Sequence, residues 1–454
     1  MLYFLIKLMA ITAIRTFFNK ISAENVDYIA KDTPIIFTAN HPNTMMDPMI
    51  IGYTCKRKLH FFAKSTLFNN LIAGWFLRRI QIVPVYRKVD DPSKMDQNKE
   101  TFSKGYEILK QNKAFLIFPE GISTGDRKLS QIKTGAARIG FGAEAENDWQ
   151  LGVQIIPVGL NYANAIKFRS DVSTRFGQPI QLTDFRDVYE RDKKEAVHLV
   201  TEQIKIALSK LTINLKDLEM QVIVEALERI YKQELAVDLG LETDNKADDF
   251  SVTKGLINAV EWYYENEPSK VNEFKGMLNL YQRLLNRLQI KDEFLDPASS
   301  RVTFWERIKA ILYIIIMFPI YLYGLINNVI PYKFPRWYAR HFVQHKAEVA
   351  PWKMLSGTII FLIYYFIEII IFASLTGSFI WTFIYALSLI PSGNFVLQYI
   401  NRVSDYRQHL RFISIFYKKR TLIYELIKQR TELIDLLNSY KIEYMDTMGL
   451  NTEK

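Results

Sequence analysis

The chain has 454 residues, of which 49% are hydrophobic and 14% aromatic, so it can bury more than one core or lie against lipid. Its single cysteine, Cys55, excludes an internal disulfide and any cysteine cluster for zinc or iron, which favours a reducing compartment. The net charge of +10 suits a polyanionic neighbour, but the apolar runs at 310–330 and 357–390 exclude an ordinary nucleic-acid-binding protein and indicate a membrane protein.

The first predicted element is an amphipathic helix over residues 1–20. This segment lacks the basic start and the small-residue cleavage site of a secretory signal, and Lys7 and Arg15 interrupt it at helical spacing. We therefore expect it to lie in a membrane interface. The alternative is an ordinary first helix packed on the next domain, since amphipathicity is the same in both cases.

Residues 21–190 are predicted to form an α/β domain in which helices flank a sheet. Short β-like runs alternate there with helical periodicity, as at 94–112 and 131–145. In such domains functional residues gather at the ends of strands. The predicted strands are PIIFTA (34–39), KLHFFA (58–63), IQIVPV (80–85), AFLIF (114–118), QIIPVGLN (154–161) and TRFGQPI (174–180).

Two later regions are predicted to be helical without strands. Residues 191–300 repeat apolar and charged residues every three to four positions, which is typical of packed helices. Residues 401–454 form a basic amphipathic tail that we expect to lie against the membrane or to dimerise.

The membrane region is predicted over residues 301–400. Basic residues flank 310–330 on both sides, which favours a re-entrant hairpin over a spanning helix. The run 357–390 is long enough for a hairpin of two short crossings that turns near 376–377. Glu368 within it is either a functional intramembrane acid or a residue that faces protein.

The segment NHPNTMMDP, residues 40–48, follows the first predicted strand of the domain. It contains His41 and, six residues later, Asp47, and Pro42 with Asn43 favours a turn that folds the carboxylate back onto one imidazole nitrogen. The other nitrogen is then left basic and directed outward. The alternative role for Asp47 is a helix N-cap, because Pro48 follows it.

Three further blocks accompany other predicted strands. VPVYR ends in Arg87, LIFPEG places Glu120 and Gly121 after a strand, and IIPVG lies within another. A tetrapeptide such as FPEG is expected by chance about 0.003 times in a chain of this length, so chance is a poor explanation of the set.

In order and spacing these four blocks resemble those of the glycerol-phosphate and lysophosphatidate acyltransferase family, over roughly residues 34–182. One departure is Gln81, where a glycine commonly opens the second block. The resemblance implies an α/β acyltransferase domain, here followed by a helical region and a membrane-associated helical region. It also implies transfer of a fatty acyl group from acyl-CoA or acyl carrier protein to a glycerol-phosphate hydroxyl. The stretch NYANAIKFRSDVSTRFGQPI is similar to members that acylate glycerol 3-phosphate or dihydroxyacetone phosphate, so glycerol 3-phosphate is the preferred acceptor and lysophosphatidate the alternative.

The resemblance and the chemistry together predict residue roles. His41 would remove the acceptor proton, because an imidazole with a pKa of about 6.5 suits neutral pH, and Asp47 would fix its tautomer. Arg87 would bind the phosphate, Glu120 would hydrogen-bond acceptor hydroxyls or order Arg87, and Gly121 would allow close backbone approach. Further basic candidates for phosphate binding, with lipid headgroups or plain surface charge as alternatives, are Lys64, Lys133, Lys167 and Arg169.

The expected partners are the glycerol-phosphate acceptor, the acyl thioester donor and membrane lipids, without nucleic acid, and no metal or redox cofactor is implied. We expect the protein in a membrane with its catalytic domain on the cytoplasmic face. The oligomeric state stays open, with a homodimer as one alternative.

Other functions fit these residues less well. GISTG, residues 121–125, matches the G-x-S-x-G pattern of a serine esterase with Ser123 as nucleophile, but no later histidine follows a short strand as that fold requires. His341 and His345 stand four residues apart without an obvious third metal ligand. A non-catalytic lipid-binding protein or a transporter would have little need of the intact His41 and Asp47 pair.

Overall fold

The structure is a computed structural model, and it describes residues 2–79, 82–86, 93, 96, 98–215, 218–242, 246–290, 292, 295, 304–418 and 420–449. The chain divides into two compact units, and each is made of two separate stretches. The first unit consists of Met1–Asn214 and Phe334–Ile359, and the second of Leu215–Lys333 and Ile360–Lys454.

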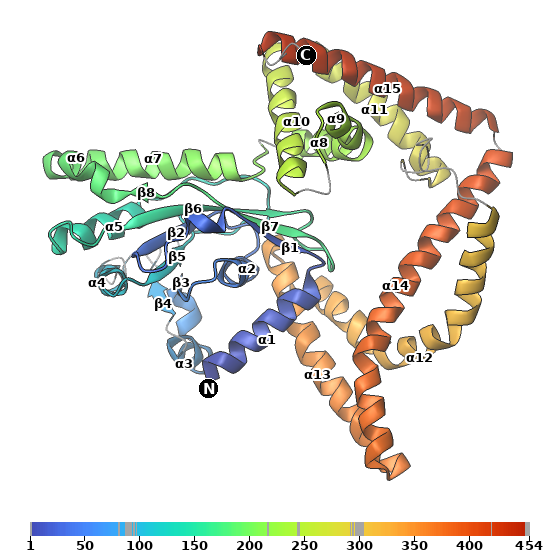
Figure 1. The fold of residues 1–454 in the computed structure, drawn as a ribbon, viewed down its shortest axis with the longest axis horizontal. Coiled ribbons are helices and arrows are strands. Elements are labelled where there is room, and N and C mark those ends of the chain that lie inside the picture. Colours follow the sequence, from blue (N-terminus) through green and yellow to red (C-terminus); the bar gives the residue numbers. More distant parts are fainter. Residues whose placement is uncertain are drawn as a thin grey trace. The chain divides into compact units, whose positions relative to one another are not determined.

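The first unit is built on a sheet that has eight strands within the described residues (Figure 1). Its strands run in the order β1-β7-β6-β2-β5-β3-β4, with β8 also paired to β6. The block β6-β2-β5-β3-β4 is parallel throughout, so the carboxyl ends of these five strands share one edge. The strands are β1 Ile21–Glu24, β2 Ile35–Ala39, β3 Leu59–Lys64, β4 Val83–Val85, β5 Ala114–Ile117, β6 Gln154–Tyr162, β7 Val172–Phe176 and β8 Ile180–Gln181.

The six predicted strands are confirmed, and the last of them is divided between β7 and β8. Strand β1 was not predicted, because ISAE is short and has no apolar run. It pairs in parallel with β7 at one margin of the sheet.

Helices cover both faces of this sheet (Figure 1). Side chains of a strand alternate between faces, so Ile35 and Phe37 of β2 pack with α1 and α2, while Ile36 packs with α5 and α7. The α/β prediction is thus confirmed. The helices of this part are α1 Leu2–Phe17, α2 Met46–Thr54, α3 Leu71–Arg79, α4 Asn98–Lys110, α5 Gly135–Glu146, α6 Arg186–Arg191 and α7 Lys193–Leu211.

Helix α1 shows features of both predicted alternatives. Ile14, at the start of its last turn, and Phe17 and Phe18 at its end are buried in the core of the α/β domain. Leu8 and Met9 are exposed apolar residues. The last turn of α1 therefore packs on the domain as in an ordinary first helix, while an earlier turn presents apolar side chains outward.

Three helices are long and apolar enough to cross a membrane within the part of the chain that is described. These candidate spans are Ile308–Phe342, Lys346–Thr376 and Phe379–Arg407. They lie in α12 Phe304–Phe342, α13 Val349–Thr376 and α14 Phe379–Lys418, respectively, the second starting just before α13.

The expected re-entrant hairpin at 310–330 is wrong, because α12 continues through Pro319 without ending. A helix satisfies its own backbone hydrogen bonds, which apolar surroundings demand, so one proline does not force a turn. The predicted turn at 376–377 is confirmed, since α13 ends at Thr376 and Gly377 has a φ of 60°.

The second unit is helical, and the described residues between 215 and 300 contain no strand, as predicted. The tail helix α15 was expected to face a membrane or a second copy. Instead, its apolar residues Ile423, Leu426 and Leu433 are buried in a core within this unit. Tyr263 reinforces this packing by donating to the Tyr440 carbonyl at 2.8 Å. The helices are α8 Leu218–Ile230, α9 Lys232–Asp238, α10 Lys246–Asn266, α11 Pro268–Leu288 and α15 Arg420–Thr447.

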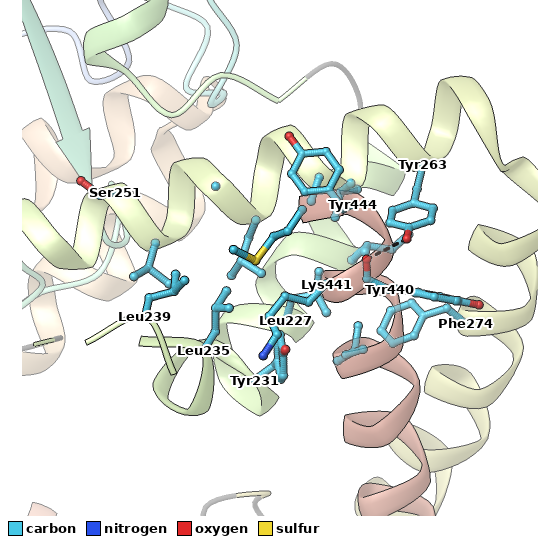
Figure 2. A pocket seen from close by; sticks show the side chains of 18 of the residues that line it. Leu227, Tyr231, Leu235, Leu239, Ser251, Tyr263, Phe274, Tyr440, Lys441 and Tyr444 are labelled. Atoms are coloured by element: carbon cyan, nitrogen blue, oxygen red, sulfur yellow. Dashed lines mark hydrogen bonds between the residues drawn. The ribbon is translucent and has the colours of Figure 1, made fainter. Parts of the chain in front are cut away.

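This core contains an apolar cavity of about 260 Å³, lined by residues of α8, α9, α10, α11 and α15. Figure 2 shows side chains that line it. Large apolar cavities are common ligand sites. This one contains none of the candidate catalytic residues, and Lys441 in its wall is paired with Asp238 at 2.7 Å. The candidate catalytic residues therefore lie outside this cavity.

Candidate functional site

The candidate site lies at the carboxyl edge of the parallel strands. Strand β2 lies between β5 and β6, so the loops that follow these three strands begin side by side. His41 follows β2 and Glu120 follows β5. Asn40 ties the turn to β6, because its side chain donates to the Leu160 carbonyl at 3.0 Å and accepts the Leu160 N–H at 2.7 Å.

The predicted contact between His41 and Asp47 is present, with 2.8 Å between Nδ1 and Oδ2. Asp47 is fully buried, and an ionised carboxylate can only accept hydrogen bonds, so Nδ1 carries the proton and Nε2 presents its lone pair. The His41 side chain stays 18% exposed and its ring stacks on Phe118 with centroids 3.8 Å apart. The ring is thus both oriented and accessible.

Asp47 has two further hydrogen-bond donors. The N–H of Asn43 lies 2.7 Å from Oδ2, and the hydroxyl of Tyr162 lies 2.6 Å from Oδ1. The N-cap alternative for Asp47 is wrong, because α2 begins one residue earlier at Met46 and the carboxylate accepts from a residue upstream. Its three donors satisfy a charge that would otherwise be costly to bury.

Sequence reasoning assigned no role to Tyr162. It ends β6, 115 residues from Asp47, so the contact depends on β6 lying beside β2. Burial, and then the charge of Asp47, raise the pKa of Tyr162 well above its usual value. The phenol therefore stays protonated at neutral pH and donates a hydrogen bond to the carboxylate.

Changing Tyr162 to phenylalanine is expected to lower the rate of acyl transfer about 10-fold, because a hydrogen bond to a charged group contributes about 1.5–3 kcal/mol, part of which orients the carboxylate. The measurement is kcat at matched protein levels in membranes. Tyr189→Phe is the control, since that ring packs on Phe141 away from the site. An unchanged kcat in Tyr162→Phe would contradict a role for the phenol.

Glu120 holds the backbone of the histidine. Its Oε1 accepts the N–H of His41 at 2.9 Å, and its Oε2 accepts the N–H of Ser130 at 2.8 Å. The side chain is buried, with 5% exposed, so it offers little surface to a substrate. This fixes the loops after β2 and β5 to each other, while the expected contact with acceptor hydroxyls stays a prediction.

Gly121 has a φ of 72°, a backbone conformation that residues other than glycine rarely adopt. A Cβ added there would lie 2.5 Å from Nζ of Lys133. The backbone N–H of Lys133 also donates to the Pro119 carbonyl at 2.9 Å. The structure thus brings Lys133 to the turn that carries Glu120, and glycine leaves room for this ammonium group.

Lys167 and Arg169 are exposed on the loop 163–171 after β6. This loop contacts the histidine turn, because the side chain of Asn43 donates to the Ala165 carbonyl at 2.8 Å. Arg169 adopts a φ of 62° and its N–H donates to the Phe17 carbonyl at the end of α1. Both cations therefore lie on a loop that borders the site.

Lys64 ends β3, two strands from β2 along the same edge, and its side chain is exposed. Neighbouring strands are about 4.8 Å apart, so its backbone lies about 10 Å from that of β2. Arg87 and Gln81 lie outside the described residues. The strand before Arg87, β4, pairs in parallel with β3.

The serine esterase alternative does not fit the local fold. A nucleophile elbow needs a helix directly after the strand and serine. Here α5 begins only at Gly135, and the Ser123 hydroxyl accepts the N–H of Thr44 at 3.1 Å. Among the described residues, no group of three or more histidine, cysteine, aspartate or glutamate side chains could hold a metal ion. His341 lies 2.9 Å from the Trp337 carbonyl of its own helix.

Comparisons with known proteins match the same region. Residues 20–161 match the family model Acyltransferase. The chain is 24% identical over 283 residues to glycerol-3-phosphate O-acyltransferase 1 of Saccharomyces cerevisiae, covering 58% of this chain and 36% of that protein. It is 27% identical over 192 residues to a 1-acyl-sn-glycerol-3-phosphate acyltransferase of Streptococcus pneumoniae, covering 41% of this chain and 64% of that protein.

The chain also matches a crystal structure of the 1-acyl-sn-glycerophosphate acyltransferase of Thermotoga maritima. The match covers 45% of this chain and 78% of the Thermotoga chain, with 21% sequence identity and a TM-score of 0.33. The match to glycerol-3-phosphate O-acyltransferase 1 spans little more than a third of the length of that yeast protein. The family match and the α/β sheet define the first unit as containing an acyltransferase domain. Within this domain the chain is similar both to glycerol-3-phosphate and to 1-acylglycerol-3-phosphate acyltransferases.

Proposed function

We propose that the protein transfers a fatty acyl group from an acyl thioester to a hydroxyl of a glycerol phosphate at a membrane surface. The observation that carries this proposal is the 2.8 Å contact between His41 Nδ1 and Asp47 Oδ2, which leaves Nε2 as a base. The donor would be acyl-CoA or acyl carrier protein. The catalytic domain would work on the cytoplasmic face.

The reaction follows from this geometry in two steps. Nε2 of His41 removes the proton of the acceptor hydroxyl as its oxygen attacks the thioester carbonyl carbon. The tetrahedral intermediate then collapses, the carbon–sulfur bond breaks, and the imidazolium returns the proton to the leaving thiolate. The products are an ester and a free thiol. No enzyme nucleophile, metal or redox cofactor takes part, because the donor is already activated.

Asp47 supports both steps without changing its own protonation. Its charge stabilises the imidazolium that forms in the first step, and its hydrogen bond keeps the proton on Nδ1. Tyr162 and the Asn43 N–H hold the carboxylate in place. The Glu120 carboxylate holds the His41 backbone, so the base has little freedom to turn away from the substrate.

Two observations support glycerol 3-phosphate as the preferred acceptor. The match to the yeast glycerol-3-phosphate O-acyltransferase extends over 58% of the chain, against 41% for the pneumococcal 1-acylglycerol-3-phosphate enzyme. The stretch 161–180 is similar to family members that acylate the smaller acceptors. The second candidate is acylation of lysophosphatidate to phosphatidate, since both reactions would use the same base.

The deciding experiment offers labelled acyl donor to membranes that contain the protein, with glycerol 3-phosphate, dihydroxyacetone phosphate and lysophosphatidate in separate reactions. We expect the highest kcat/KM with glycerol 3-phosphate. A higher value with lysophosphatidate would replace the preferred acceptor by the second candidate. Absence of acylation with every acceptor and both donors would overturn the proposed function.

Arg87→Ala is expected to raise the apparent KM for the phosphate acceptor about 10- to 100-fold, because a hydrogen-bonded contact to a charged group contributes about 1.5–3 kcal/mol. The KM for the donor should change little. Arg191→Ala, which alters an exposed arginine at the end of α6, is the matched control. An acceptor KM equal to that of the wild type would remove Arg87 from the phosphate site.

A further inference from the structure

The connection between α12 and α13, residues 343–348, belongs to the first unit and contacts loops of the candidate site. It contains a short 3-10 helix, Lys346–Glu348, and leads directly into α13. Ala347 and Ala350 are buried, and Ala350 and Met354 belong to the same core cluster as residues of β2 and α2. The connection is therefore part of the core beneath the site, although it is distant in sequence.

Three polar contacts join this connection and the start of α13 to the three loops that form the site. The Thr44 hydroxyl, in the loop after β2, donates to the Ala347 carbonyl at 3.1 Å. Lys346 pairs with Asp126, in the loop after β5, at 3.0 Å. The ammonium group of Lys353 donates to the carbonyl of Ile166, in the loop after β6, at 2.9 Å.

These contacts differ in how strongly they hold the loops in place. Lys346 and Asp126 are each about half exposed, and a solvent-exposed ion pair of this kind contributes little. The Ala347 carbonyl, in contrast, belongs to a buried residue whose backbone is closely seated. A Cβ added at Gly125 would lie only 2.9 Å from the Ala347 nitrogen. The hydrogen bond donated by the Thr44 hydroxyl therefore has a rigid acceptor, the Ala347 carbonyl.

Thr44 itself is held in an unfavourable conformation. Its φ is 35°, which is rare for a β-branched residue, and such conformations persist only where the surroundings enforce them. Two hydrogen bonds hold it, one from its N–H to the Ser123 hydroxyl at 3.1 Å and one from its hydroxyl to Ala347. Thr44 lies between His41 and Asp47 in the turn that joins base and carboxylate.

We propose that Thr44 is a positioning residue and that residues 346–354, the end of the connection and the start of α13, are a working part of the active site. By accepting the Thr44 hydroxyl, the Ala347 carbonyl fixes the turn in which Asp47 meets His41. Residues 346–354 open the second candidate span, directly after the end of the first at Phe342, so they would tie the base to the start of a membrane helix. This inference rests on the proposed function and names residues that set its rate.

The first test replaces Thr44 with valine, which keeps the shape and the branched Cβ but removes the hydroxyl. We expect kcat to fall about 10- to 100-fold, because small displacements of a catalytic group cost that much, with both KM values within about twofold. Thr44→Ser keeps the hydroxyl and should restore most of kcat. Thr174→Val is the matched control, because that buried threonine also donates to a backbone carbonyl, of Ser22 at 3.2 Å, between strands.

The second test is Thr44→Gly, which relieves the positive φ and also removes the hydroxyl. A positioning role predicts a lower kcat together with a melting temperature equal to or above that of the wild type. A purely structural role predicts that activity and melting temperature fall together. The glycine variant also remains informative if the valine variant fails to fold, because glycine suits this backbone conformation.

The outcomes separate the two proposals. Wild-type kcat in both Thr44→Val and Thr44→Gly would overturn the positioning role, while acylation by the wild-type protein would leave the proposed function standing. A parallel fall of kcat and melting temperature in Thr44→Gly would also overturn it. A wild-type protein inactive with every acceptor would instead overturn the proposed function.

Discussion

Replacing His41 with alanine is expected to lower the turnover of acyl transfer by about 10²- to 10⁴-fold, the usual contribution of a general base. The protein should stay in the membrane fraction, because the candidate spans lie elsewhere in the chain. The alcohol would then lack a partner for its proton during attack on the thioester. The measurement is kcat with saturating donor and acceptor, together with fractionation of the same preparation.

His198→Ala is the matched control, since this exposed histidine lies on α7. It should leave turnover unchanged. Turnover that survives in His41→Ala would remove the general-base role and direct attention to the Ser123 hydroxyl, which lies beside the same turn.

Two substitutions of Asp47 are expected to separate its charge from its hydrogen bonds. Asp47→Asn can still accept from His41 and Asn43 if its amide nitrogen turns toward Tyr162, whose hydroxyl can accept. It loses only the negative charge, and we expect kcat to fall about 10- to 100-fold. Asp47→Ala leaves three donors without their acceptor in a buried place, so kcat should fall about 10²- to 10⁴-fold and the melting temperature should also fall.

Asp184→Asn is the control for the two Asp47 variants, because Asp184 is an exposed carboxylate in the short 3-10 helix that follows β8. The measurements are kcat and thermal unfolding for each variant. If Asp47→Asn and Asp47→Ala both keep the wild-type kcat, the carboxylate does not orient the base.

The parts of the site that sequence could predict are those encoded locally. His41 and Asp47 lie within one turn, so residue types and spacing suffice to predict their contact. Glu120 could be placed at the same edge of the sheet because it follows a strand. Its hydrogen-bond partner, the His41 N–H, could not be predicted. Its bond to the His41 N–H depends on β5 pairing with β2, and strand order is not readable from the strands themselves.

Contacts between residues far apart in the sequence could not be predicted from it. Tyr162 lies 115 residues from Asp47, and Ala347 lies 303 residues from Thr44. The apolar runs of 301–400 were recognisable from composition as candidate membrane-spanning helices, although basic residues on both sides of 310–330 wrongly suggested a hairpin. The tail α15 was misjudged because amphipathic periodicity reveals an apolar face without revealing what covers it.

The acyltransferase unit is discontinuous in sequence, because Phe334–Ile359 completes what Met1–Asn214 begins. Residues 215–333 form a long excursion that folds with 360–454. No uninterrupted fragment of the chain can therefore reproduce the unit without carrying this excursion along. Cleavage within it would divide the unit between two polypeptides, one with His41 and the other with Ala347, and the pieces would have to reassociate for the turn to be clamped.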